Sequence, residues 1–174
     1  MKMLWSVLKR TGRINVAITF MRKSVQLNPQ DAEAYNNYGV TLQELVKLDE
    51  AEASYTKAIM VEPNYIEAHC NLGNTFKDQG KFDKAITAYN KVISIKPNNA
   101  EIYYNMGLAF KFLGKLDKAI ACYTKAIELS TNYADAHNNI SNALQEQSKL
   151  DDAIEAYKKS ISIKSNNSDA HINL

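Results

Sequence analysis

The side chains in this sequence that are best suited to chemistry are its three histidines and two cysteines. His69, His137 and His171 recur at one position of an internal repeat, in different copies, which separates them too widely for a shared metal ion. Cys70 follows His69 directly, but adjacent residues on a helix point apart, so a Cys–His nucleophile pair is not expected. Cys122 lies among helical residues and is expected to pack as a small side chain. We therefore expect no catalytic site, no metal site and no cofactor.

Asparagine forms the most regular polar pattern in the chain. One asparagine recurs at a constant spacing, at Asn37, Asn71, Asn105, Asn139 and Asn173. Asparagine is a poor residue for the middle of a helix, so its recurrence there needs another reason. The amide has two donors and an acceptor, and it can bond a peptide backbone in both directions without reading side chains. A row of amides about 10 Å apart, the spacing of packed helices, can follow an extended chain.

These asparagines belong to an internal repeat whose copies follow one another without an insertion. The segment at 32–39 returns at 66–73, 100–107 and 134–141. The sequence therefore predicts a single repeat array over 1–174. Its parts are a partial repeat 1–31, full repeats 32–65, 66–99, 100–133 and 134–167, and a truncated repeat 168–174.

Each repeat is expected to contain two helices. In the first full repeat the pattern predicts helices over 32–45 and 49–61, with a break at 46–48 that carries glycine in two later copies. The second helices begin at an aspartate (Asp49 in the first copy), which is expected to cap free amides and to meet the positive end of the helix dipole. Small residues such as Gly39 recur where helices must approach closely, and large residues such as Tyr55 lie between them. Neither helix can bury its apolar face alone, so stacking makes the core.

The repeat resembles a known family. Tyr35-x2-Tyr38-Gly39-x2-Leu42, followed by Ala51-x3-Tyr55 and Pro63, is similar to the tetratricopeptide repeat pattern, whose period is about 34 residues. The resemblance implies an all-α fold, a right-handed α-solenoid of antiparallel helix pairs whose first helices line a concave groove that binds polypeptides. It implies no catalysis. The asparagine row is similar to the asparagine ladder of the O-linked N-acetylglucosamine transferases, whose repeats hold the backbone of protein substrates. That likeness implies peptide-backbone contact at the five asparagines; the alternative is that they bond neighbouring helices or water.

Helical geometry places the asparagines on one open stripe of each first helix. At about 100° per residue, the stripe of repeat 66–99 runs through Glu67, Asn71, Asn74 and Asp78. The candidate peptide-binding residues on these stripes are Asn37, Asn71, Asn74, Asn105, Leu108, Phe112, Asn139, Asn142 and Asn173.

The composition of the stripes indicates the kind of ligand. They are rich in carboxylates and amides, so a neutral or basic extended peptide is favoured, because like charges repel on approach. Leu108 and Phe112, with Tyr104 beside them, are expected to form an apolar spot that can hold one ligand side chain. The groove lacks the lysines and arginines of the carboxylate clamp found in chaperone-binding tetratricopeptide repeats, which argues against that function.

Overall composition excludes several classes of protein. The chain has 174 residues, a net charge of +2, 45% hydrophobic residues, two cysteines and no apolar run long enough to span a membrane. Residues 1–30 hold six basic and no acidic residues (+6) and 31–174 contribute −4. Because the basic segment fits the repeat register, we interpret it as structure rather than as a targeting peptide. We expect a cytoplasmic protein with no nucleic-acid and no membrane partner.

Three functions remain open at the level of the sequence. The first is a protein–protein interaction scaffold that binds an extended peptide through the asparagine ladder. The second is the substrate-recruiting region of a larger enzyme, such as a protein O-GlcNAc-type glycosyltransferase, because the sequence ends inside a repeat without a polar capping helix. The third is a self-associating scaffold that uses exposed ends of the array.

Overall fold

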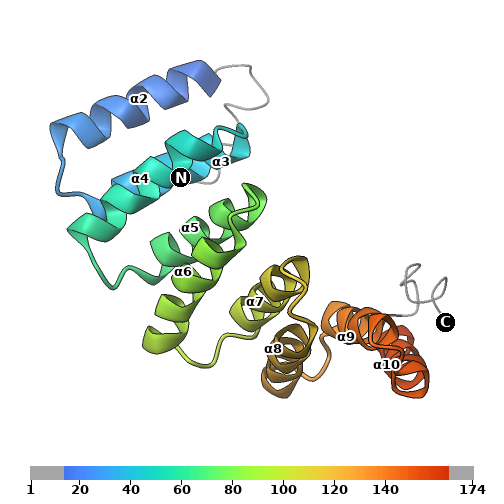
Figure 1. Cartoon of the computed structure of the whole chain (residues 1–174). Helices are drawn as coiled ribbons and strands as arrows, with labels where there is room; N and C mark the ends of the chain where they lie inside the picture. The colour runs from blue at the N-terminus through green and yellow to red at the C-terminus, as the bar shows by residue number, and fades with distance from the viewer. Residues whose placement is uncertain (1–13, 165–174) are drawn as a thin grey trace. The chain divides into compact units, whose positions relative to one another are not determined.

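The computed structural model describes residues 14–164, and these residues are helical apart from short connections (Figure 1). The helices are α2 (Ile14–Leu27), α3 (Ala32–Glu44), α4 (Leu48–Val61), α5 (Ile66–Asp78), α6 (Phe82–Ile95), α7 (Ala100–Phe112), α8 (Leu116–Leu129), α9 (Ala134–Glu146) and α10 (Leu150–Ile163). The predicted helices 32–45 and 49–61 agree with α3 and α4 to within one residue at each end. The truncated repeat 168–174 lies outside the described residues.

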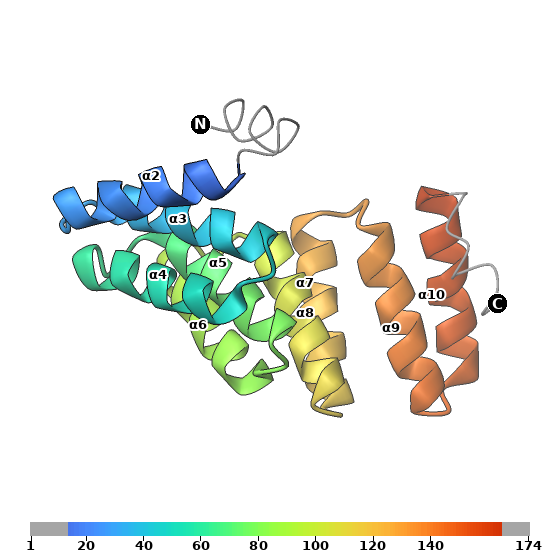
Figure 2. The same ribbon diagram turned by 90° about the horizontal axis from the view of Figure 1, so that it is seen from above.

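The helices group into two compact units, Met1–Gly80 and Lys81–Leu174. In the described part of the first unit, α3 packs on α2, pairs with α4 and also contacts α5, which packs on α4. In the second unit, α6 packs on α7, α7 pairs with α8, and α8 packs on α9, which pairs with α10. Figure 2 shows the α7–α8 and α9–α10 pairs from above. The boundary between the units falls inside repeat 66–99, between its two helices.

Tyrosines at one repeat position belong to the core of the repeats. Tyr55, Tyr89, Tyr123 and Tyr157 are fully buried. A Cβ atom added to Gly39 would lie 2.6 Å from the ring of Tyr55, and one added to Gly107 would lie 2.4 Å from the ring of Tyr123. These positions admit no side chain without displacement of the tyrosine, so the predicted close approach of the two helices is confirmed there.

The turn between the two helices of a repeat requires a left-handed residue. Backbone φ is +72° at Gly80 and +68° at Gly114, as the glycines in the predicted break suggest. The same place is occupied by Val46 at +60° and Ser148 at +62°. A β-branched valine is strained in this conformation, so the turn geometry is imposed by the packing of the flanking helices.

The helix starts require one correction. The aspartates of the second helices were expected to cap them, but the N-cap residues are lysines (Lys47 in α4) whose side chains make no cap bond. The aspartates lie in the first turn, near the positive end of the dipole, and Asp49 accepts a hydrogen bond from Gln79 Nε2 at 2.9 Å. Side-chain caps occur instead at two of the first helices, α3 and α7, where Asp31 and Asn99 accept from backbone amides three residues ahead.

Candidate functional site

In three of the four described first helices, the residues at both ends of the predicted stripe are exposed to solvent and the residues in its middle are half-buried. In α3, Glu33 and Glu44 are exposed and Asn37 is half-buried between them. The stripes of α5 and α9 repeat this order, with half-buried residues Asn71, Asn74, Asn139 and Asn142. In α7 the pattern differs, because Asn105 is buried, with 7% of its surface exposed. Asn173 lies outside the described residues.

Two asparagines of the row form hydrogen bonds to the preceding first helix. In the first unit, Asn71 Nδ2 donates to Asn36 Oδ1 at 3.0 Å, which joins α5 to α3. In the second unit, Asn139 Nδ2 donates to the Tyr104 hydroxyl at 3.0 Å, which joins α9 to α7, and also to the Asp135 carbonyl at 3.0 Å. Each interhelical acceptor lies 35 residues before its donor. The amides therefore help to pack the repeats, which was the alternative interpretation of the row.

The carbonyl oxygens of the row are not used in this packing. Within residues 14–164, the side-chain Oδ1 atoms of Asn37, Asn71 and Asn139 accept no hydrogen bond, and none of the three atoms is a buried unpaired acceptor. Asn142 differs, because its Oδ1 accepts a hydrogen bond from the buried Tyr157 hydroxyl. Three asparagines of the predicted row thus present an unpaired acceptor at a half-buried position.

Sequence reasoning missed the acceptors that orient the row. They are Asn36 in α3 and Tyr104 in α7, and each lies directly before a row position; Asn138 has the same place in α9. Asn138 Oδ1 is buried and has no partner among the described residues. The sequence did contain a signal for these acceptors. In each case a polar residue lies 35 positions before a row asparagine, which is one repeat and one residue earlier.

The predicted apolar spot divides into two parts. Tyr104 and Leu108 pack against the core residues Ala119, Tyr123 and Ala136, and the Tyr104 ring stacks on Tyr133 with 4.9 Å between centroids. Phe112 is separate from this cluster: 68% of its surface is exposed and its ring stacks on Phe82 at 4.9 Å, with 3° between the planes. Of the predicted trio, only Phe112 offers a large accessible apolar surface.

The first helices carry an excess of negative charge. Helices α3, α5, α7 and α9 together hold seven acidic residues and two lysines, a net charge of −5. Glu101 and Asp135 are exposed and form no ion pair with another described residue. Burial, then the neighbouring Tyr104 hydroxyl and these two carboxylates, raise the pKa of Tyr133 to about 12. Among residues 14–164, the stripes therefore have the charge that the sequence predicted.

The histidines and cysteines occupy packing positions. His69 is buried and its Nε2 lies 2.9 Å from the carbonyl oxygen of Pro63. Burial, together with the charge of Lys159, lowers the pKa of His137. Burial raises the pKa of the Cys122 thiol to about 11, which keeps it protonated and unreactive at neutral pH. His171 is outside the described residues, and within the described part no three metal-ligating side chains come together.

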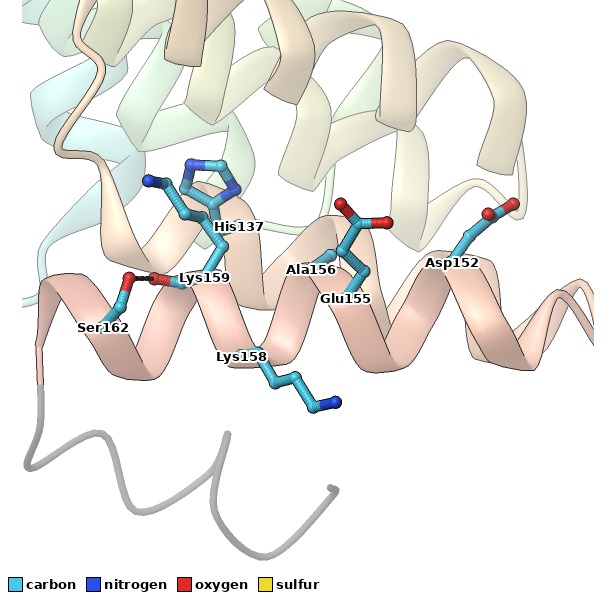
Figure 3. A pocket seen from close by; sticks show the side chains of 7 residues that line it. All are labelled: His137, Asp152, Glu155, Ala156, Lys158, Lys159 and Ser162. Carbon is cyan, nitrogen blue, oxygen red and sulfur yellow. Dashed lines mark hydrogen bonds between the residues drawn. The ribbon is translucent and has the colours of Figure 1, made fainter.

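A surface cavity of about 510 Å³ lies elsewhere, on α9 and α10 (Figure 3). It is lined by His137 from α9 and, from α10, by Asp152, Glu155, Ala156, Lys158, Lys159 and Ser162. Its two acids and two lysines compensate one another, and Ser162 Oγ donates to the Lys159 carbonyl oxygen at 2.8 Å. None of the predicted peptide-binding residues lines this cavity.

Family profiles match residues 6–155 of the chain in overlapping segments. Profiles described as "TPR repeat" match residues 47–80 and 73–114. Profiles described as "Tetratricopeptide repeat" match residues 100–133, 20–53, 122–155 and 6–31. The chain belongs to the tetratricopeptide repeat family. No curated protein matches it by sequence search.

Solved tetratricopeptide-type structures share its fold. A crystal structure of MamA is 24% identical with a TM-score of 0.87, and the match covers 92% of this chain and 94% of that chain. MamA from Desulfovibrio magneticus RS-1 is 20% identical with a TM-score of 0.86, covering 96% and 94%. PilF from Pseudomonas aeruginosa is 18% identical with a TM-score of 0.81, covering 98% and 78%. At these identities the likeness establishes the fold alone.

The predicted family and all-α solenoid class are thus confirmed. As a tetratricopeptide repeat array, the chain is a protein-interaction scaffold. Across residues 14–164, no helix combines the length and apolar character needed to cross a membrane. The right-handed twist of the whole array and its groove stay predictions.

Proposed function

We propose that this tetratricopeptide repeat scaffold binds an extended peptide segment of another protein along its asparagine row. The observation that supports the proposal is the unpaired Oδ1 of Asn37, Asn71 and Asn139 among the described residues. An extended peptide has backbone amides that need acceptors, and these oxygens recur once in each of three repeats. The row would hold the backbone and leave selectivity to other positions.

The packing bonds favour this role because they orient the amides. In a planar amide the nitrogen and the oxygen point in different directions. Asn71 Nδ2 is fixed toward Asn36, and Asn139 Nδ2 is fixed toward Tyr104, so each Oδ1 is directed away from the preceding helix. A side chain held in one rotamer loses less entropy when it binds a ligand. The interhelical bonds and the peptide contacts are therefore compatible uses of one side chain.

The charge of the first helices defines the partner further. Helices with seven acidic residues and two lysines repel acidic segments and favour neutral or basic ones. Because the charges lie mostly at exposed positions, this preference weakens as the salt concentration rises.

The test is a triple replacement of the row, Asn37→Ala, Asn71→Ala and Asn139→Ala, in the full chain. Asn105 is left unchanged because it is buried. Binding is measured by fluorescence anisotropy to short capped peptides, selected from an array that contains neutral, basic and acidic sequences. Each lost hydrogen bond is worth about 1 kcal/mol, or roughly 5-fold in affinity, so the triple variant is expected to bind about 100-fold more weakly.

The matched control uses three asparagines that also share one repeat position but lie exposed in the turns before α5, α7 and α9. These replacements are Asn64→Ala, Asn98→Ala and Asn132→Ala. A peptide N-methylated on its backbone should bind the wild type as weakly as its parent binds the row variant. Equal affinity of the folded row variant and the control variant would contradict the ladder, and failure of every peptide to bind would contradict peptide recognition itself.

A further inference from the structure

Comparison of the four full repeats with one another reveals two positions at which a single repeat carries an exceptional residue. Both exceptional residues are phenylalanines. The last residue of each first helix is acidic at Glu44, Asp78 and Glu146, but is Phe112 in α7. The first residue of each second helix is leucine at Leu48, Leu116 and Leu150, but is Phe82 in α6. The two exceptions come from adjacent repeats.

The structure brings these two residues into direct contact. The Phe112 and Phe82 rings are parallel within 3° at a centroid distance of 4.9 Å, and both lie in the second compact unit. Phe82 is half-buried, whereas 68% of Phe112 is exposed. One ring therefore supports one face of the other and leaves its outer face to solvent. An exposed, rigidly supported aromatic ring is typical of an anchor position in an interface.

The charges beside the rings are paired with one another. Lys111, next to Phe112, lies 3.9 Å from Glu146, and Asp83, next to Phe82, lies 3.6 Å from Lys115. Each pair is internally neutral, so neither pair gives the ring a strong attraction for a cation or an anion. This differs from the carboxylates at the other end of the stripe, such as Glu101, which forms no ion pair with another described residue. An apolar ring whose charged neighbours are paired is suited to bind an uncharged, apolar side chain of a ligand.

We propose that the Phe82–Phe112 stack is the specificity-determining anchor of the interaction face, and that it receives one aromatic or large aliphatic side chain of the bound peptide. The proposal rests on the proposed function for the remainder of that peptide. Phe112 lies on the same stripe of α7 as the row position Asn105, seven residues or about 10 Å further along the helix. Asn105 itself is buried, but a peptide that crosses α7 at this position needs only about three further residues of extended chain to reach the stack.

The binding of a single side chain can be measured without the peptide. The probe is N-acetyl-tryptophanamide, titrated into isotope-labelled full chain while amide chemical shifts are recorded. We expect saturable shifts at residues around Phe82 and Phe112, and none with N-acetyl-argininamide. The row variant Asn37→Ala, Asn71→Ala, Asn139→Ala should retain these shifts, which separates failure of the anchor from failure of the ladder.

Two replacements taken from the chain's own repeats serve as variants. Phe112→Glu introduces the residue that repeats 32–65 and 134–167 carry there, and it should weaken probe binding at least about 10-fold. Phe82→Leu introduces the residue of the three other second helices and, by removing the supporting ring, should weaken binding by about 3-fold. The matched control Glu146→Gln leaves the rings intact and should bind as wild type. Absence of saturable shifts in the wild type, or equal shifts in the folded Phe112→Glu protein, would overturn the proposal.

Discussion

The buried tyrosine of repeat 100–133 lacks the hydrogen-bond partner that two of its counterparts have. Tyr55 donates to Gln43 Oε1 at 2.9 Å, and the Tyr157 hydroxyl shares its one proton between Asn142 Oδ1 and Gln145 Oε1, the latter at 3.0 Å. The corresponding position before Tyr123 is Lys111, and the Tyr123 hydroxyl is buried without a partner among the described residues. Burial raises the pKa of both Tyr55 and Tyr123, so both phenols remain protonated donors at neutral pH. We predict that Lys111→Gln stabilises the protein.

The magnitude follows from two opposing contributions. A hydrogen bond supplied to a buried, unpaired hydroxyl contributes about 1 kcal/mol net. The replacement also removes the Lys111–Glu146 ion pair, whose 3.9 Å separation and 29% and 52% side-chain exposures limit its value to about 0.5 kcal/mol at most. The expected gain is therefore about 0.5 to 1 kcal/mol, or roughly 2 °C in melting temperature for a chain of this size.

The assay is a double-mutant cycle followed by urea unfolding and far-UV circular dichroism. Tyr123→Phe should leave the wild type as stable or more stable, because it removes a buried unpaired hydroxyl, but it should cost about 1 kcal/mol in the Lys111→Gln protein. The reverse replacement, Gln43→Lys, should destabilise by about 1 to 3 kcal/mol because Tyr55 then loses its acceptor. If Tyr123→Phe has the same effect on stability in both backgrounds, the introduced glutamine does not accept a hydrogen bond from the Tyr123 hydroxyl, and the reasoning is refuted.

Two further predictions concern the turns and the pH dependence. Val46→Gly should stabilise the protein by about 1 kcal/mol, because Val46 is 77% exposed and held at φ +60°, while Gly114→Ala should cost about as much. The two substitutions should shift the midpoint of urea unfolding in opposite directions. A loss of stability in Val46→Gly would exclude backbone strain at this position. The pKa values of Cys122 and Tyr133 are raised by burial to about 11 and about 12, so the unfolded chain loses these protons first as the pH rises. Stability should therefore decline from about pH 9 to pH 12, and Cys122→Ala should flatten the lower part of that decline; an unchanged profile would contradict the burial of the thiol.

Much of the fold was predictable because it is encoded locally and repeatedly. The period of the repeat, the helix bounds of α3 and α4 and the Gly39–Tyr55 packing follow from patterns within one or two helices. The capping role assigned to Asp49 was wrong because the helix begins one residue earlier, at Leu48, and the side chain pairs with Gln79 of the next repeat instead. Local propensity cannot report a partner in another repeat.

The exposure pattern of the stripes was predictable in outline but not in detail. Helical periodicity placed the stripes correctly, with exposed ends at Glu33 and Glu44. It could not distinguish buried Asn105 from half-buried Asn71, since both occupy the same repeat position and differ only in their surroundings. Nor could it show that Asn139 uses its amide nitrogen on Tyr104, because that contact depends on the distance between two helices.

The sequence by itself determined that this chain is an array of helix pairs with a row of amides on the first helices. Repetition carries that information, since a residue that recurs at a fixed period lies on the same face of the same element in every copy. Only the tertiary structure decided what the row and its neighbours are free to do. In the folded protein the amide nitrogens of Asn71 and Asn139 donate hydrogen bonds to the preceding first helix, while their oxygens stay unpaired within the described residues. Packing also stacks the ring of Phe112 on that of Phe82. Such outcomes depend on side chains meeting across repeats, and that geometry is fixed by the packing of whole helices.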